Sequence, residues 1–200
     1  MLGFCRQCQW REQFKQLPDD QKERYILSVI PKRYLAAKIS DLPAAAQKIL
    51  SEAKPEQGIY VWGPAGVGKT HTLAALGISS LRDGFDVKRI TYDMLCLQLR
   101  SSYKPNSNQT ELDIIKPLVE ADMLILEDVG TTVSVGNQES DFSLRTFLII
   151  LNERYEKCLP TFISGNKSVE EIEKSFDSRI ASRLRSGLIL PVTGKDKRRK

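Results

Sequence analysis

One eight-residue segment constrains the fold more than any other part of the chain. It runs from Gly63 to Thr70 and reads Gly-Pro-Ala-Gly-Val-Gly-Lys-Thr, which matches the pattern G-x-x-x-x-G-K-[ST]. It lies between a predicted strand, 59–62, and a predicted helix, 70–81. In this setting the glycines let backbone N–H groups curve around phosphates at the start of a helix. We therefore expect a P-loop in an α/β domain, rather than a glycine-rich turn that matches by chance.

The P-loop assigns a role to each of its functional side chains. Lys69 is expected to neutralise the β- and γ-phosphate oxygens of ATP, and Thr70 is expected to offer its hydroxyl to Mg²⁺. The expected ATP-contacting residues form one continuous run: Gly63, Pro64, Ala65, Gly66, Val67, Gly68, Lys69, Thr70 and His71.

Two adjacent acids follow a second apolar strand. Residues 123–126 read Met-Leu-Ile-Leu and are followed directly by Glu127 and Asp128. This arrangement is a Walker B motif, in which one acid holds Mg²⁺ and the other positions the attacking water. The alternative is a surface turn that carries two solvated acids. Because a P-loop requires a metal partner on a neighbouring strand, we favour the catalytic interpretation.

The pattern along the chain alternates between strands and helices. Apolar runs predict strands at 59–62, 87–91, 123–126, 161–164 and 188–191. Helices are predicted at 17–30, 40–54, 70–81, 93–103 and 141–156, with a short one before the third strand and two more that begin after the capping residues Ser168 and Asp177. This order predicts a five-stranded parallel sheet covered on both faces, with ligands at the carboxyl ends of the strands. We expect residues 1–40 to form a small N-terminal helical appendage and residues 41–200 to form the ATPase domain.

Composition narrows the class of protein further. The longest apolar stretches are too short to span a bilayer, and no signal-peptide pattern begins the chain, so a soluble cytoplasmic protein without a membrane partner is expected. The formal net charge is +5, and residues 195–200 read KDKRRK. Such a tail suits a polyanionic partner, but it also suits simple solubilisation. Cys5 and Cys8 have the spacing of half a zinc site, although two ordinary reduced thiols fit equally.

Further motifs give the chain a resemblance to the AAA+ ATPases, and within them to the DnaC/IstB family of helicase loaders and transposition ATPases. The segments that carry it are 30–34 (IPKRY), 90–92 (ITY), 126–130 (LEDVG), 152–155 (NERY), 162–166 (FISGN), 178–187 (SRIASRLRSG) and 193–198 (TGKDKR). The resemblance covers the chain from about residue 31 onward. It implies an AAA+ P-loop core, with Asn166 as the sensor 1 residue and an arginine finger in the segment after Asp177.

Two arginines are candidates for that finger. Arg179 and Arg183 are four residues apart on a predicted helix, so both project from one face while Ile180 and Leu184 pack inward. We expect this pair to face no acidic partner and to await an external anion. The resemblance implies that Arg183 acts in the active site of a neighbouring subunit, so the protein would self-associate through its ATP site. The alternative is a surface arginine or a contact to DNA phosphate.

The sequence departs from the family pattern in two ways. The family usually has Asp-Asp or Asp-Glu in the Walker B motif, whereas this chain has Glu127 followed by Asp128. That exchange leaves the division of roles open and predicts slow hydrolysis. The helical lid with its sensor 2 arginine is expected to be absent, and the sequence leaves open whether Arg198 or Arg199 replaces that residue.

A DNA contact is expected on the helix after the second strand. Arg100 and Lys104 lie one turn apart on it, and Tyr92 and Tyr103 lie near its ends. Cations that follow a phosphate backbone, beside aromatic rings that stack on bases, are features of single-strand binding grooves. An ordinary amphipathic helix with a solvated basic face is the alternative.

These features together favour an ATP-dependent replication protein that loads a hexameric replicative helicase of the DnaB type onto single-stranded DNA. The appendage is the candidate helicase contact, although its apolar Tyr25, Ile26 and Val29 fit packing on the ATPase domain equally well. An IstB-like helper of a transposase shares the same motifs. A small-molecule P-loop kinase is a more distant alternative, because it leaves the segment 178–187 unexplained.

Overall fold

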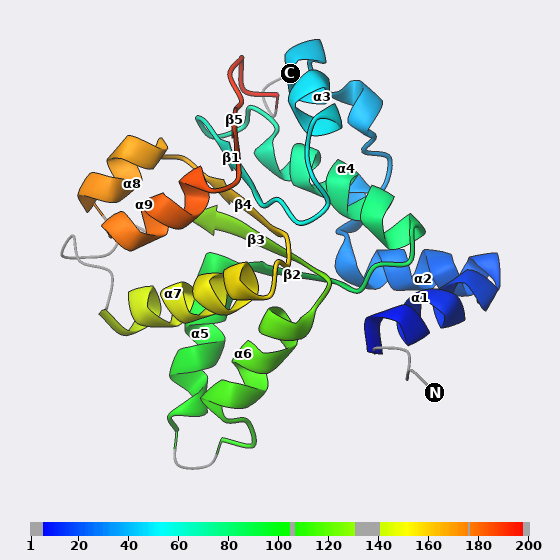
Figure 1. Cartoon of the computed structure of the whole chain (residues 1–200), viewed down its shortest axis with the longest axis horizontal. Helices are drawn as coiled ribbons and strands as arrows, with labels where there is room; N and C mark the ends of the chain where they lie inside the picture. The colour runs from blue at the N-terminus through cyan, green and yellow to red at the C-terminus, as the bar shows by residue number, and fades with distance from the viewer. Residues whose placement is uncertain (1–5, 105–106, 131–140, 176, 198–200) are drawn as a thin grey trace.

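The protein is built around one parallel β-sheet with helices on both faces (Figure 1). The computed structural model describes residues 6–104, 107–130, 141–175 and 177–197. The strands are β1 (Ile59–Trp62), β2 (Val87–Thr91), β3 (Met123–Val129), β4 (Thr161–Gly165) and β5 (Leu188–Pro191), in the spatial order β2-β3-β4-β1-β5. Every pairing is parallel. The predicted five-stranded parallel sheet is therefore confirmed.

The helices divide between the two faces of the sheet. On one face lie α1 (Arg6–Gln16), α2 (Asp19–Val29), α3 (Ala44–Ser51) and α4 (Lys69–Arg82); on the other lie α5 (Tyr92–Ser102), α6 (Glu111–Glu120), α7 (Asp141–Glu156), α8 (Val169–Ser175) and α9 (Ser178–Arg185) (Figure 1). Strand β3 contributes side chains to the apolar core on each face of the sheet. Met123 and Ile125 pack with α4, whereas Leu124 and Leu126 pack with α5 to α7. This alternation follows from the two-residue period of a strand that is buried on both sides.

Capping residues set the helix starts that the sequence predicted. The Asp177 carboxylate accepts the Arg179 N–H at 2.7 Å at the start of α9. Ser168 and Glu171 form the reciprocal bonds of a capping box before α8, with 2.7 Å from the Ser168 N–H to the Glu171 carboxylate. The helix expected over 40–54 is shorter, because Pro43 lies at its start and only Ala44–Ser51 is α-helical.

The N-terminal helices pack on the ATPase core. Ile26 is buried among residues of α4 and β2, with Tyr25 and Val29 beside it. The Tyr25 hydroxyl donates to Asp86 Oδ1 at 2.9 Å, and its ring contacts Trp10 of α1. Helix α1 was not predicted from the sequence. The apolar side of α2 was expected either to contact a helicase or to pack on the domain, and the structure shows that it packs on the domain. No helix in the described ranges is long and apolar enough to cross a membrane.

Candidate ATP site

The P-loop joins β1 to α4 at the carboxyl edge of the sheet. Gly68 stands at the N-cap of α4 with φ +112°, a backbone conformation that suits glycine, and its carbonyl accepts the Thr72 N–H at 3.0 Å. Val67 is 2% exposed, so its side chain anchors the loop in the core. The N–H groups of the first turn of α4 therefore follow the loop directly, which is the geometry of an anion site.

Lys69 is held inside the loop by three acceptors. Its ammonium donates to the carbonyls of Gly63 at 2.9 Å and Pro64 at 2.8 Å, and to Asn166 Oδ1 at 2.6 Å. Only 6% of the residue is exposed. Asn166 follows β4, which is the neighbour of β1, so the topology brings it to the loop. The structure thus joins the P-loop lysine to the residue expected as sensor 1.

The first Walker B acid lies beside the P-loop threonine. Glu127 is 2% exposed and hydrogen-bonds to the Thr70 side chain. Its Oε1 also accepts a bond of 2.6 Å from Arg89 Nε on β2. Burial raises the pKa of the Glu127 carboxyl, while Arg89 and Thr70 act in the opposite direction. Sequence analysis missed Arg89, because its proximity to Glu127 becomes visible only when the strand order is known.

The second acid occupies an unusual backbone position. Asp128 has φ +59°, and the register between β3 and β4 shifts between Leu126 and Val129. The Asp128 N–H donates to Ser164 Oγ at 3.1 Å, so this buried serine, also missed from the sequence, holds the irregularity in place. Left-handed backbone at a residue other than glycine costs about 1 kcal/mol or more and is often found at functional sites. Here it keeps both acids next to the P-loop.

A cavity of about 380 Å³ opens beside these groups. Its walls come from Arg33, Tyr34, Asp41, Gly66, Gly68, Lys69, Thr70, His71, Asp128 and Lys197. His71 Nε2 lies 3.5 Å from Asp41 Oδ2. Four of these wall residues were not predicted as site residues: Arg33, Tyr34, Asp41 and Lys197. Two of them, Arg33 and Tyr34, belong to the motif at 30–34.

The oxygen donors suit a magnesium ion. Thr70 and Asp128 offer a hydroxyl and a carboxylate at the wall of the cavity, and Glu127 adds a second carboxylate bonded to Thr70. Mg²⁺ prefers a small number of such protein oxygens and completes its shell with water and phosphate. The described residues contain no cluster of three or more His, Cys, Asp and Glu side chains suited to a metal. Cys5 and the side chain of Cys8 lie outside the described part of the chain, as do Arg198 and Arg199.

Residues 37–189 match the family model described as "IstB-like ATP binding protein". This span takes in the P-loop, both Walker B acids, Asn166 and Arg183. The chain belongs to the IstB-like ATP-binding family.

Relatives of this IstB-like chain include proteins of replication and of transposition. It is 28% identical over 131 residues to the insertion sequence IS21 putative ATP-binding protein of Pseudomonas aeruginosa, covering 66% of this chain and 46% of that protein. It is 27% identical over 129 residues to the replicative helicase loader DnaI of Bacillus subtilis, covering 64% of this chain and 39% of the loader. The chain therefore spans less than half of the length of these relatives.

Solved structures share the fold at lower identity. A crystal structure of DnaI superposes with a TM-score of 0.66 at 23% identity, covering 84% of this chain and 94% of that one. The replication initiator DnaA bound to AMPPCP and single-stranded DNA gives a TM-score of 0.67 at 18% identity, covering 83% and 51%. These neighbours confirm the AAA+ P-loop fold class.

The candidate arginine finger of the IstB-like chain is not among the residues that line the cavity beside the P-loop. Arg183 Nε donates to Asn152 Oδ1 at 2.9 Å, and the guanidinium stands 4.4 Å from the centroid of the Tyr155 ring. Arg183 lines a second cavity, of about 540 Å³, which also includes Gly58 and Ile59 at the amino end of β1. The P-loop residues thus lie at the carboxyl edge of the sheet, and the candidate arginine finger lies at its amino edge.

The expectation that the arginine pair faces no acid is wrong for Arg179. Its guanidinium pairs with Asp177, with 2.8 Å between Arg179 Nη2 and Asp177 Oδ2. The cause is local, because the carboxylate that caps α9 also reaches the side chain two residues later. Ile180 and Leu184 pack inward as predicted. Arg183 is therefore the better candidate of the two.

The candidate DNA-binding residues separate into one buried and three exposed side chains. Tyr92 is 1% exposed, and its ring packs edge-on against Phe147 at 5.6 Å, so it offers no face to a base. The expectation for Tyr92 is therefore wrong, because the first residue of α5 points into the core.

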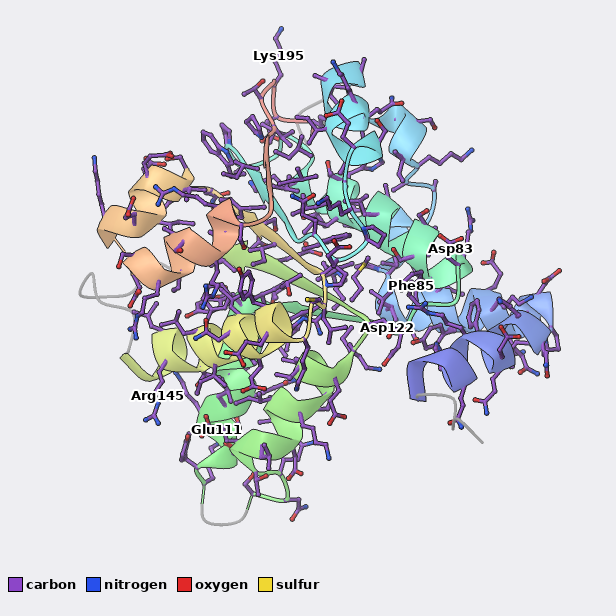
Figure 2. All side chains as sticks on the ribbon, in the orientation of Figure 1. Asp83, Phe85, Glu111, Asp122, Arg145 and Lys195 are labelled. Atoms are coloured by element: carbon purple, nitrogen blue, oxygen red, sulfur yellow. The ribbon has the colours of Figure 1, made fainter. Side chains whose placement is uncertain are left out.

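The other three candidates, at the end of α5, are exposed. Tyr103 donates from its hydroxyl to Glu111 Oε2 at 2.7 Å, a bond that raises the pKa of the hydroxyl, whereas the charge of Arg145 acts in the opposite direction. Figure 2 shows Arg145 on α7 and Glu111 on α6 on the same side of the molecule. Arg145, missed from the sequence, is therefore a further cation near Tyr103.

Proposed function

We propose that this chain is an ATP-dependent replication protein that loads a hexameric replicative helicase onto single-stranded DNA. The observation that carries the proposal is the convergence of Lys69, Asn166, Thr70 and Glu127 at one edge of the sheet, in a chain whose relatives include replicative helicase loaders. ATP binding and hydrolysis would control assembly with the helicase in the cytoplasm.

The site residues divide the ATPase chemistry among them. Lys69 binds the β- and γ-phosphate oxygens, while Thr70 and Glu127 hold Mg²⁺. When bound, this ion neutralises the charge that develops on the transferred phosphoryl group. Asp128 lines the cavity and orients the attacking water, and Asn166 positions Lys69 through their 2.6 Å bond. Arg89 already neutralises part of the Glu127 charge, which is consistent with slow hydrolysis.

Hydrolysis would require a second copy of the chain. Arg183 contacts Asn152 and Tyr155, at the edge of the sheet away from its own P-loop. We assign it as the finger that completes the site of a neighbouring subunit, so that assembly and turnover are coupled. Arginine fingers of this kind raise the turnover rate by about 10³ to 10⁵.

The DNA contact is assigned to the exposed end of α5. Arg100, Tyr103 and Lys104 lie there, and Arg145 adds a cation from α7. Phosphate contacts from such cations, together with stacking on an exposed ring, bind single strands without a requirement for sequence. A structural neighbour of this chain is described as bound to single-stranded DNA, which supports the assignment.

The helicase contact is assigned to the N-terminal appendage, residues 1–40. Because Tyr25, Ile26 and Val29 pack against the ATPase core, the contact would use the outward side of α2, where Leu27 is 41% exposed.

A second candidate function is assistance to a transposase. It is favoured by the match to the IstB-like family model and by the similarity to the IS21 protein. The small-molecule kinase alternative has no such support, and family membership argues against it.

Capture of purified partners tests the proposal. The tagged chain is incubated with ATP and either a DnaB-type helicase or an IS21-type transposase, with Lys69→Ala as the control that should not bind ATP. ATP-dependent retention of the helicase, followed by its transfer to circular single-stranded DNA, is the expected result. Retention of the transposase alone would replace the loader assignment with the transposition role.

A further inference from the structure

The segment that follows β5 crosses the P-loop. At its start, the Val192 N–H donates to the Trp62 carbonyl at 2.8 Å and continues the ladder between β1 and β5. At its other end, the Lys197 N–H donates to the Gly66 carbonyl at 3.0 Å. Between these anchors the chain turns outward, and Figure 2 shows Lys195 projecting away from the body of the protein. The segment is thus fixed by backbone bonds to β1 at one end of its turn and to the P-loop at the other.

Asp196 packs directly on the middle glycine of the P-loop. A Cβ placed on Gly66 would collide with the Asp196 carboxylate, so a larger residue there would require this side chain to move. Gly66 also has φ +80°, which independently favours glycine. The loop and the segment are therefore shaped for each other at this point.

This contact places the side chain of Lys197 over the last glycine of the loop. Its ammonium is 3.5 Å from the position that a Cβ on Gly68 would take, and Lys197 lines the same cavity as Lys69, Thr70 and Asp128. The backbone N–H groups of this part of a P-loop surround the α- and β-phosphates. The ammonium therefore stands where the phosphates of a nucleotide would enter.

We propose that Lys197 is a second cation of the nucleotide site, which contacts the phosphates of bound ATP or ADP in cis and is held in place by the packing of Asp196 on Gly66. An ammonium on a flexible stem suits this task, because it can follow a phosphate oxygen without the fixed geometry of a guanidinium. The role goes beyond the expected P-loop contacts and rests on the assignment of this cavity to a nucleotide.

Affinity for a series of ligands tests this role. Titration of fluorescent ATP and ADP, with adenosine as a competitor, is compared among the wild-type protein, Lys197→Ala, Lys197→Arg and Lys197→Glu. Lys197→Ala is expected to weaken ATP and ADP alike by about 3- to 5-fold, the effect of one exposed ion pair. Lys197→Arg should restore most of the loss and Lys197→Glu should enlarge it, while adenosine affinity stays constant because adenosine carries no phosphate.

The exposed neighbour Lys195 supplies the matched control, since Lys195→Ala removes the same charge from the same segment without touching the cavity. Equal affinities for Lys197→Ala and wild type, or the same loss for Lys195→Ala, would overturn the role of Lys197 while the P-loop assignment stands. The Lys69→Ala variant distinguishes failure of the Lys197 role from failure of the nucleotide assignment. If wild type binds ATP no better than Lys69→Ala, the nucleotide assignment fails, and the role of Lys197 fails with it.

Discussion

The two edges of the sheet differ in how their charged side chains are satisfied. At the carboxyl edge, Lys69 bonds to Asn166, and Glu127 bonds to Arg89 and to Thr70, the neighbour of Lys69, so residues from α4, β3, β2 and the loop after β4 are held together. At the amino edge, the described contacts of Arg183 are with Asn152 and Tyr155 of a single helix, α7.

This difference indicates which steps one copy of the chain can perform. The carboxyl edge holds the groups proposed for nucleotide and metal binding close to one another, so we expect binding to need no partner. Arg183 is positioned by Asn152 and Tyr155, and it is not among the residues that line the cavity beside the P-loop. Turnover, in contrast with binding, should therefore depend on assembly.

The largest effect is expected from Lys69→Ala. The ammonium is the cation inside the loop and satisfies three oxygen atoms, so its removal should abolish ATP binding at practical concentrations. Calorimetric titration measures the affinity, and circular dichroism checks that the variant is folded. The control is Lys116→Ala, an exposed lysine of α6 that should bind ATP normally. A folded Lys69→Ala protein with unchanged affinity would contradict the P-loop assignment.

Arg183→Ala should next separate turnover from binding. We expect ATP affinity to stay within a few-fold of wild type, while the turnover number under assembling conditions falls by about 10³. Arg185→Ala on the same helix is the matched control, because Arg185 pairs with Glu173 at 2.6 Å and should leave turnover intact.

Mixing the two inactive proteins sharpens the comparison between the edges. Lys69→Ala keeps an intact finger and Arg183→Ala keeps an intact P-loop, so mixed assemblies should contain some complete sites and regain part of the ATPase activity. Normal turnover by Arg183→Ala alone would remove it as the finger and make Arg179 the candidate, despite its pairing with Asp177.

A stability effect is expected at Arg154, which lies between the two Arg183 contacts, Asn152 and Tyr155, in the chain. Arg154 is fully buried, and its Nη1 donates to the carbonyls of Leu118 at 2.8 Å and Ala121 at 2.7 Å, while Nη2 donates to Pro160 at 2.8 Å. Burial lowers its pKa to about 10, so it remains charged at neutral pH. Arg154→Ala should lower the free energy of unfolding by about 3 kcal/mol, because buried carbonyls lose their donor.

Urea denaturation measures that loss of stability, with Glu153→Ala on the exposed side of α7 as the control. Within the motif 152–155, Arg154 would then serve stability, whereas Asn152 and Tyr155 would serve turnover through their contacts with Arg183. A stability equal to that of wild type would show that water replaces the guanidinium.

The sequence was most informative where function is local. The P-loop motif could be located because its residues are contiguous, and the structure places it between β1 and α4 as expected, with a left-handed backbone at Gly68. The alternation of apolar strands with helices likewise predicted all five strands and a sheet in which they run parallel. Both successes depend on signals confined to short windows.

Contacts between distant segments could not be predicted. Arg89 meets Glu127 only because β2 and β3 are neighbours, and Asp128 keeps its left-handed backbone through Ser164 of β4. Tyr92 was misassigned because a tyrosine at the start of an amphipathic helix faces either the core or solvent, and only the position of Phe147 decides between them. Single-sequence reasoning has no access to such pairings.

The smallest effect is expected far from both edges, at the exposed end of α5. Arg100 and Lys104 lie on the surface beside Tyr103, so each is expected to contribute only a modest phosphate contact. Arg100→Ala/Lys104→Ala should weaken binding to single-stranded DNA of any sequence by roughly 3- to 10-fold, and leave ATP affinity unchanged. Fluorescence anisotropy at several salt concentrations measures both the affinity and its salt dependence.

The salt dependence distinguishes a phosphate contact from a general loss of positive charge. Each lost phosphate contact should reduce the slope of log affinity against log salt by about 0.7 for a single strand, because fewer counterions are released. The control variant Lys15→Ala/Arg24→Ala removes the same charge from the exposed sides of α1 and α2, and should keep the wild-type slope. If both double variants shift the isotherms equally, binding reflects net charge and α5 is an ordinary solvated helix. If only the α5 variant flattens the slope, the DNA follows this helix, at a surface separate from the ATP cavity and from Arg183.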